Sequence, residues 1–590
     1  MRRYTGYILS TIILTLSITG ARMQNNALLF AMLGVIIAAL LLVVFDKVDE
    51  RQYPVLLFFI GLGLIYQVTL MTNYLVGTDI HYEYYFALQT YDSGSWDSSI
   101  GHSYNAATSI SVFIPFMARF LHIPLAWAFK AIPPLFLAGV PVVVYHIFKH
   151  EFDTKTAFLS TFFFISVPTM FLELSGLAKQ AIGELFLISC LGLIVYNSFK
   201  RGWLRYVLIG LLAILTALAH YSMGGTLFFY LLGAVVLLPI GKYLFKRNPN
   251  ISLKYLTLTF AIFTVVIVIF YGWAARGAAL HDILTSMGIT SGVATASSAS
   301  FAAYSHWTYP EPAVGVALGA DFADVDATAK VFRLFQYATQ ILIIVGCIAI
   351  LVQYKKRSLG YLVFLALSGA ILALVLFYPG FSPLFNASRF YNLILLFMAP
   401  AAIIGGKLIF RNYKVLTIAI LIPYFLFTSG AVFEITKVDS LTTITLPYSH
   451  SLSAARLDST ALFTDNDIAA RDWVKANGKF PIYGDMWGST AMFEVQSNLS
   501  MEVNTMLAES EWLVYCFVYR DDETEPEPVP DDCYILLRER NTEKREITYQ
   551  VGVGLRKTLS YAAVGFDKVL SGREIVFQSG NAIVYGVKER

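Results

Sequence analysis

The strongest constraint on the fold of this chain is a series of apolar runs, each about 20 residues long, separated by polar connections. A run of that length forms a helix that can cross about 30 Å of hydrocarbon. The candidate runs lie at 5–21, 27–45, 54–72, 125–148, 156–173, 181–199, 203–220, 224–244, 254–274, 331–353, 359–378, 390–410 and 413–433. Only 14% of the 590 residues are charged, against roughly 25% in soluble proteins. The sequence therefore predicts an α-helical polytopic membrane protein with about 13 transmembrane helices.

Basic residues predict the orientation of these helices, because cytoplasmic loops are enriched in Lys and Arg. Arg2 and Arg3 precede the first run, which we interpret as a retained helix since no convincing small-residue cleavage site follows. With the N-terminus in the cytoplasm, every second connection is basic. These connections carry Lys47 and Arg51; Lys149 and Lys155; Lys200, Arg201 and Arg205; Lys242, Lys246 and Arg247; Lys355, Lys356 and Arg357; and Lys407, Arg411 and Lys414. The alternation holds only if Ala106–Leu121 lies at the interface and does not cross the membrane.

The composition divides the chain into two parts. Residues 1–433 are predicted to form the transmembrane helical domain, with long outer loops at 73–124 and 276–330. Residues 434–590 are far more polar and are predicted to form a small extracytoplasmic α/β domain. The whole chain is predicted to lie in the cell membrane. In it we expect a helix at Asp465–Asn477 and strands at Phe480–Tyr483, Trp512–Tyr519, Cys533–Leu537 and Ala582–Val587.

The densest polar stretch in the first half of the chain is Gly77–Tyr85 in the first outer loop. It follows the run at 54–72 directly, so Asp79 is predicted to lie just outside the end of that helix. A carboxylate there can act as general base on an incoming hydroxyl group. Asp79 is the first candidate, Glu83 can replace it, and His81 is a third catalytic candidate. A plainer interpretation stays open, in which Asp79 only caps a helix.

Ionisable residues also mark the outer ends of other runs, where they are costly and indicate function. The candidates for binding a lipid phosphate are Lys179, Glu184, His220, Arg276, Arg389 and Tyr391. Arg389 is the sharpest of them, because it lies outside against the positive-inside trend and Arg can hold phosphate through two parallel hydrogen bonds. Plainer roles stay open: Lys179 and Glu184 can pair with each other, His220 can bond a carbonyl group, and Arg276 can simply end a helix. An anion that the bilayer delivers is most simply a lipid phosphate or pyrophosphate.

An acidic residue in the first outer loop, a large helix bundle and an outer α/β tail together resemble the GT-C superfamily of membrane glycosyltransferases. The segment Asp465–Asp485, which ends Pro-Ile-Tyr-Gly-Asp, is similar to the tails of uncharacterised archaeal members. The resemblance implies inverting transfer of a sugar from a polyprenyl- or dolichyl-phosphate donor to a glycan, lipid or protein acceptor on the extracytoplasmic face, with Asp79 as the base. Asp485–Gly488 does not match the Trp-Trp-Asp motif of the oligosaccharyltransferase branch, so no divalent metal or other cofactor is expected.

Other classes of function remain open. A transporter or flippase for a lipid-linked or anionic substrate predicts inverted repeats and broken helices. A lipid-linked glycan polymerase or ligase would need several arginines in a large outer loop, and a non-catalytic scaffold is a further possibility. The net charge of +3 gives no indication of nucleic acid as a partner, whereas membrane lipid is an expected one. Four cysteines exclude a disulfide-rich scaffold and leave a Cys516–Cys533 pair as an open question.

Overall fold

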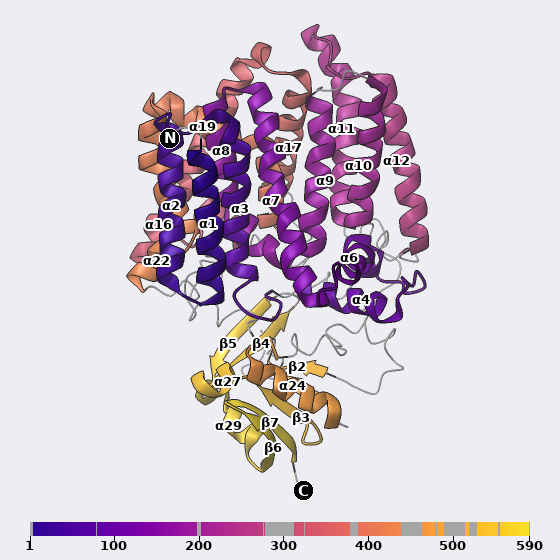
Figure 1. Cartoon of the computed structure of the whole chain (residues 1–590), viewed down its shortest axis with the longest axis vertical. Coiled ribbons are helices and arrows are strands. Elements are labelled where there is room, and N and C mark those ends of the chain that lie inside the picture. The colour runs from indigo at the N-terminus through magenta and orange to yellow at the C-terminus, as the bar shows by residue number, and fades with distance from the viewer. Residues whose placement is uncertain are drawn as a thin grey trace. The chain divides into compact units, whose positions relative to one another are not determined.

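The computed structural model describes residues 4–77, 79–196, 202–274, 277, 312–323, 325–377, 387–437, 463–477, 481–485, 487–488, 514–517, 528–552 and 555–588. These residues form two compact units. The first contains the described residues of 1–73, 86–283 and 308–456, and the second contains those of 74–85 and 457–590. The first unit is helical and the second mixes helices with strands (Figure 1). The predicted fold class, a polytopic helical membrane protein with a small α/β domain, is confirmed.

Ten helices in the described part of the chain are long and apolar enough to cross a membrane. They are α2 (Asn26–Val44), α3 (Tyr53–Thr69), α7 (Leu125–Glu151), α9 (Ala178–Val195), α10 (Gly202–Ala219), α11 (Tyr221–Phe245), α12 (Leu253–Ala274), α16 (Ala327–Val352), α17 (Leu359–Phe377) and α19 (Ala387–Phe410). An eleventh span arises if α8 (Thr154–Ile165) is counted together with Thr169–Gly176, to which it is bent by 60°. Pro168 lies at this bend, where a residue without a backbone N–H interrupts the helical hydrogen bonds.

The remaining two predicted spans are also helical but are not among the helices that are long and apolar enough to cross a membrane. Helix α1 (Thr5–Arg22) is rich in Ser and Thr, and it packs against α2 and α3. The last run becomes a shorter apolar helix, Tyr413–Thr428, built from α20 (Tyr413–Leu416), the π-helical turn η6 (Thr417–Leu421) and α21 (Ile422–Thr428); the short α22 (Ala431–Thr436) follows. The structure therefore supports ten or eleven spans by length and composition, fewer than the predicted number.

Helix α19 is the best-buried helix of the C-terminal half of the bundle and packs against α8, α16 and α17. Its contact with α16 depends on glycine. A Cβ atom on Gly346 would overlap the carbonyl group of Ala401, and one on Gly405 would overlap that of Leu342. Small residues allow two membrane helices to approach this closely, which increases their van der Waals contact. Arg389 therefore lies in the first turn of a closely packed helix.

The loops predicted to be cytoplasmic lie together at one end of the bundle. Lys155 Nζ is 2.9 Å from a carboxylate oxygen of Asp46, and the backbone N–H of Ser358 donates to the Glu151 carboxylate at 2.9 Å. At the end of α1, the Arg22 guanidinium donates to the carbonyl oxygen of Thr72, beyond the far end of α3. The basic and the non-basic connections thus lie at opposite ends of the helix bundle. The assignment of the basic end to the cytoplasm stays a prediction.

The segment predicted to lie at the interface is a helix too short to span. It comprises the π-helical turn η2 (Ser109–Phe113) and α6 (Ile114–Leu121). As one apolar helix, Ser109–Leu121 is about 20 Å long, less than the roughly 30 Å of hydrocarbon. The expectation that this segment does not make a full crossing agrees with its length.

Reporter fusions test the orientation of the bundle. A reporter placed after Lys414 should report the cytoplasm, and one placed after Asp439 should report the opposite side, because the run at 413–433 is predicted to cross the membrane once. The measurement is the activity of a reporter that works on one side only, in intact cells. Equal signals from the two fusions would refute the predicted orientation of the last helix.

The second unit contains a five-stranded mixed sheet in the order β2–β1–β3–β7–β6. Its strands are β1 (Ile482–Gly484), β2 (Val514–Cys516), β3 (Tyr534–Leu537), β6 (Arg573–Ser579) and β7 (Ala582–Lys588). Strand β1 pairs in parallel with β2 and β3, whereas β7 pairs antiparallel with β3 and β6. A separate antiparallel hairpin is formed by β4 (Glu546–Gly552) and β5 (Leu555–Ser560).

Helices cover this sheet and complete two small apolar cores. Helix α24 (Asp465–Asn477) packs on β6 and β7, and its Ala470 and Val474 meet Val584 in one core. The other core is formed around Phe517, Ile535, Tyr549 and Phe566, and includes residues near α28 (Tyr561–Val564) and α29 (Phe566–Leu570). Cys533 belongs to this second core as a free thiol that donates to the Pro530 carbonyl oxygen, and the side chain of Cys516 lies outside the described residues.

A buried ion pair links the sheet to α27 (Glu539–Lys544). The Arg538 guanidinium lies 3.1 Å from the Asp485 carboxylate, and both side chains are excluded from solvent. The Asp485 carboxylate also accepts from the Asn541 amide at 2.9 Å and from the Gly488 backbone N–H. Because this carboxylate has several donors, the pair is a structural element of the domain, and removing one partner alone would leave a buried charge uncompensated.

Candidate functional site

The predicted catalytic stretch, Gly77–Tyr85, belongs to the second unit. The Tyr74 hydroxyl donates to the Asp465 carboxylate at the start of α24, at 2.8 Å. The His81 ring meets the Phe463 ring edge-on, with centroids 5.5 Å apart. Phe463 and Trp487 form a small apolar core in which Tyr74 takes part. Residues 74–85 are thus held by the C-terminal α/β domain, which lies far away in the sequence.

Asp79 is the first residue of helix α4 (Asp79–Ser93). Its side chain is half-buried, and Glu83, one turn later, is fully buried. A carboxylate at a helix N-terminus is favoured by the helix dipole, so Asp79 stabilises the start of α4 whether or not it is also a base. The assignment of Asp79 or Glu83 as the catalytic base stays a prediction.

His81 is a packed, neutral side chain. Burial and then the charge of Arg471 lower its pKa to about 3, although a hydrogen bond with the Leu75 backbone opposes the shift in part. An imidazole with such a pKa is a weak base and is neutral at neutral pH, so it is not available there as a general acid. The predicted catalytic role of His81 remains untested, and its surroundings favour a structural role in holding residues 74–85.

The pKa of His81 predicts that the second unit loses stability in acid. The folded-state pKa lies below the unfolded value of 6.5, so the unfolded state binds the extra proton as pH falls below 6.5. Between about pH 6.5 and pH 5 the loss from this group should be about 2 kcal/mol. Thermal unfolding of the full chain, followed by tryptophan fluorescence, would measure it. His81→Phe should show a smaller loss over this window, and equal losses in both proteins would contradict the assignment.

In the first unit, the structure joins the predicted anion ligand Arg389 to a carboxylate. Arg389 Nε lies 2.7 Å from the Glu173 carboxylate, which also accepts from the Ser388 hydroxyl at 2.6 Å. Glu173 ends the π-helical turn η3 (Thr169–Glu173), directly after the bend at Pro168, and the turn η4 (Leu174–Gly176) follows. Because this bond uses Nε, it orients the guanidinium plane, and the Arg389 side chain keeps 29% of its surface exposed.

Lys179 and His220 lie within electrostatic range of this pair. The Lys179 ammonium lies 3.6 Å from the centre of the Tyr104 ring, a cation–π contact. Burial, then the charges of Lys179 and Arg389, lower the pKa of His220 well below its usual range. His220 Nδ1 accepts the backbone N–H groups of Ser222 and Met223, so the ring proton is assigned to Nε2, which becomes a hydrogen-bond donor.

Glu184 lies deeper in the bundle. Its carboxylate accepts from the Asn392 amide at 2.8 Å, and both side chains are fully buried. This bond joins α9 to α19 one turn below Lys179 and Arg389. Tyr391 packs against the apolar core of the bundle. Neither of the predicted roles for Glu184 and Tyr391 is tested by these contacts.

The structure thus brings together Arg389, Lys179 and His220, and it adds residues that the sequence did not assign to the site: Glu173, Ser388, Tyr104 and Asn392. Arg276 lies outside the described residues. Glu173 carried a signal in the sequence, since it is an acidic residue at the outer end of an apolar run. Its partner could not be inferred, because 216 positions separate it from Arg389.

The electrostatics of this cluster are unfavourable for the helices themselves. Lys179 is the second residue of α9, and Arg389 is the third residue of α19. A cation in the first turn opposes the helix dipole, at a cost of about 0.3–1 kcal/mol. The N-termini of the two helices and the two cations therefore form one positively charged region. Among the contacts described above, Glu173 supplies its negative charge. Such an arrangement attracts an anion.

Among the described residues, no three His, Cys, Asp or Glu side chains gather in a way that could hold a metal ion. The expectation that the protein needs no divalent metal is a separate statement about its chemistry and stays a prediction.

Three solved structures of GT-C glycosyltransferases are similar to this chain. The oligosaccharyltransferase of Archaeoglobus fulgidus, in complex with Zn and sulfate, has a TM-score of 0.41 and 15% identity, with 75% of this chain covered. ArnT from Cupriavidus metallidurans, bound to undecaprenyl phosphate, has a TM-score of 0.35 and 11% identity, covering 91% of this chain and 97% of its own. The mycobacterial arabinofuranosyltransferase AftD has a TM-score of 0.40 and 11% identity, covering 92% of this chain and 40% of its own.

The chain spans 61% of the length of the Archaeoglobus fulgidus enzyme. No curated protein matches the chain. The family described as "Predicted membrane protein (DUF2206)" matches residues 205–585, which is more than half of the sequence, and the chain therefore belongs to this family.

Proposed function

We propose that the protein is an inverting membrane glycosyltransferase that uses a polyprenyl- or dolichyl-phosphate sugar on the extracytoplasmic face. The observation that carries the proposal is the placement of Lys179 and Arg389 in the first turns of α9 and α19, where the helix dipoles oppose them. Cations that weaken their own helices are explained if they bind an anion. Glu173 supplies one negative charge to Arg389, and a lipid phosphate is a further anion that can reach these residues in a bundle of membrane helices.

The reaction assigns separate tasks to the two groups of residues. Arg389 and Lys179 bind the phosphate, and the Nε2–H of His220 supplies a further donor. Asp79 removes the proton from the acceptor hydroxyl as its oxygen attacks the anomeric carbon. The bond between that carbon and the phosphate oxygen breaks, and the lipid phosphate leaves with the bond electrons. The acceptor, whether glycan, lipid or protein, ends with the sugar attached in the inverted configuration.

Glu173 should act as a positioning residue for Arg389. Glu173→Gln keeps an oxygen for Arg389 Nε but removes the competing charge, so the affinity for a polyprenyl phosphate should rise about two- to fivefold. Glu173→Ala removes the oxygen as well, so the guanidinium loses its orientation and the affinity should fall. Titration of the purified protein with polyprenyl phosphate measures both effects. A similar loss in the two variants would show that the carboxylate charge stabilises the site instead of competing with the ligand.

One observation favours a second candidate, a transporter or flippase for a lipid-linked anion. Broken membrane helices are typical of transporters, and the span formed by α8 and Thr169–Gly176 is bent by 60° just before Glu173. The two candidates differ in what they do to the substrate. Proteoliposomes loaded with a radiolabelled lipid-phosphate sugar would show a released sugar product for the transferase, and only a change of leaflet for the flippase. Movement of the intact lipid with no transfer would overturn the first proposal.

A further inference from the structure

Helix α6 exposes a face that suits the membrane interface. Phe116 and Phe120 are 61% and 65% exposed, and their rings stack with centroids 6.0 Å apart. On its other side α6 packs against α7, where Phe113 meets Phe136 edge-on at 5.7 Å. A short helix with large apolar side chains on one face and a cation, Arg119, beside them is typical of a helix that lies in the interface plane.

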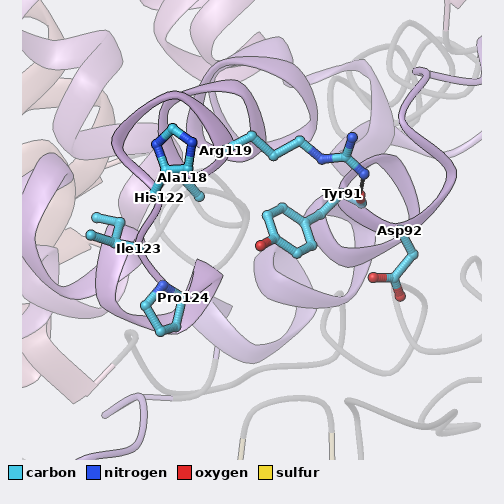
Figure 2. Close-up of a pocket in the computed structure, with 7 residues that line it drawn as sticks. All are labelled: Tyr91, Asp92, Ala118, Arg119, His122, Ile123 and Pro124. Atoms are coloured by element: carbon cyan, nitrogen blue, oxygen red, sulfur yellow. Dashed lines mark hydrogen bonds between the residues drawn. The ribbon is translucent and has the colours of Figure 1, made fainter.

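A pocket of about 730 Å³ opens between α6 and the C-terminal part of α4. It is lined by Tyr91, Asp92, Ala118, Arg119, His122, Ile123 and Pro124 (Figure 2). Arg119 lies over the Tyr91 ring, 5.2 Å from its centre, and donates to the Tyr91 carbonyl oxygen. Figure 2 shows Asp92 on the same side of the pocket as the Arg119 guanidinium, with His122 on the other side of the Tyr91 ring. The pocket therefore combines a cation, an anion and an aromatic face.

The position of the pocket along the bundle corresponds to the headgroup layer. Pro124 precedes α7 directly, and the 27 residues of α7 are about 40 Å long, some 10 Å more than the hydrocarbon thickness. Trp127 in the first turn of α7 lies beneath Arg22 at 5.4 Å and Lys130 at 5.6 Å. Tryptophan beside cations marks a membrane–water boundary. The beginning of α7, and the pocket next to it, thus lies at the level of lipid headgroups.

We propose that this pocket binds the headgroup of a membrane lipid that carries both a phosphate and an ammonium group. Arg119 holds the phosphate. Asp92 pairs with the ammonium, which also lies against the Tyr91 ring. The acyl chains run beside Phe116 and Phe120. A headgroup with both charges is favoured over a purely anionic one because Asp92 would repel the latter.

Lipid binding to the purified full-length protein tests the proposal. Native mass spectrometry with equal amounts of phosphatidylethanolamine and phosphatidylglycerol should show a preference for phosphatidylethanolamine. Asp92→Asn should reduce that preference about two- to fivefold, because an exposed charge pair is lost. Arg119→Gln should weaken the binding of both lipids. Lys356→Gln, an exposed cation at the other end of the bundle, is the control and should change neither.

Two further experiments distinguish a lipid from a soluble ligand, and lost binding from a folding defect. Glycerophosphoethanolamine, which lacks acyl chains, should compete poorly, and Phe116→Ser with Phe120→Ser should weaken lipid binding but leave its headgroup preference intact. Because Arg119 also bonds the Tyr91 carbonyl, Arg119→Lys is the variant that keeps the charge, and it should recover part of the binding. Equal binding of the two lipids to the unaltered protein, or an unchanged preference in Asp92→Asn, would overturn the proposal. Full competition by the soluble headgroup would overturn the assignment to a lipid.

Discussion

Asp79→Asn should lower sugar transfer by about 10²–10⁴-fold while the affinity for the lipid donor stays nearly the same. Asparagine has nearly the shape of aspartate but cannot accept the proton of the acceptor hydroxyl, and positioned general bases contribute rate factors of this size. Asp79 is proposed to act on the acceptor and not on the phosphate, so kcat should fall and donor binding should not. Single-turnover transfer from a radiolabelled lipid-phosphate sugar measures the rate, and titration with polyprenyl phosphate measures the affinity.

Two comparisons make the Asp79 result interpretable. Glu574→Gln, an exposed carboxylate on β6 of the second unit, should leave the rate unchanged. Glu83→Gln changes a fully buried carboxylate on the same helix, so its folding has to be checked by size-exclusion chromatography. If Asp79→Asn keeps full activity and a folded Glu83→Gln loses it, Glu83 is the base. If neither variant affects transfer, neither carboxylate is the base and the proposed mechanism fails.

Arg389→Ala should weaken donor binding by about 1.5–3 kcal/mol, or roughly 10- to 150-fold, because a charge-assisted bond to phosphate is lost in a partly buried site. The loss should appear in the donor affinity as well as in kcat/KM, since the contact is made in both the ground and the transition state. Titration with polyprenyl phosphate again gives the value. Arg389→Lys should recover only part of it, because an ammonium group cannot form two parallel bonds to phosphate.

In Arg389→Ala the Glu173 carboxylate loses its ion-pair partner, and this unpaired charge can itself weaken the binding of an anion. The double variant Arg389→Ala with Glu173→Gln removes this unpaired charge. If the donor affinity is low in the single variant and returns to normal in the double variant, Arg389 neutralises Glu173 and does not bind phosphate. A low affinity in both variants supports the phosphate contact. Thermal unfolding of each variant separates lost binding from lost folding.

The membrane part of the fold could be predicted from local sequence alone, because each span is a continuous apolar run whose length matches the bilayer. The same holds for α24, whose observed bounds Asp465–Asn477 agree with the prediction. Strands β1, β3 and β7 were also predicted close to their positions. In all these elements the pattern of apolar and polar residues within one segment reflects the face that becomes buried.

The tertiary structure decided the features that depend on distant partners. Strand β6 was not predicted because it lies at the edge of the sheet, where most of its side chains are exposed and leave no alternating pattern. His81 was predicted as a catalytic residue from its neighbours in the sequence, yet it packs on Phe463, which lies far along the chain.

The candidate site divides in the same way. The sequence by itself predicted that Lys179 and Arg389 lie near the ends of helices, because charged side chains limit where an apolar run can begin. Only the folded structure determined that Arg389 bonds Glu173 and that Glu184 bonds Asn392. Hydrogen bonds between helices join groups more than 200 positions apart. Their geometry follows from how whole helices pack, which no local pattern of residues encodes.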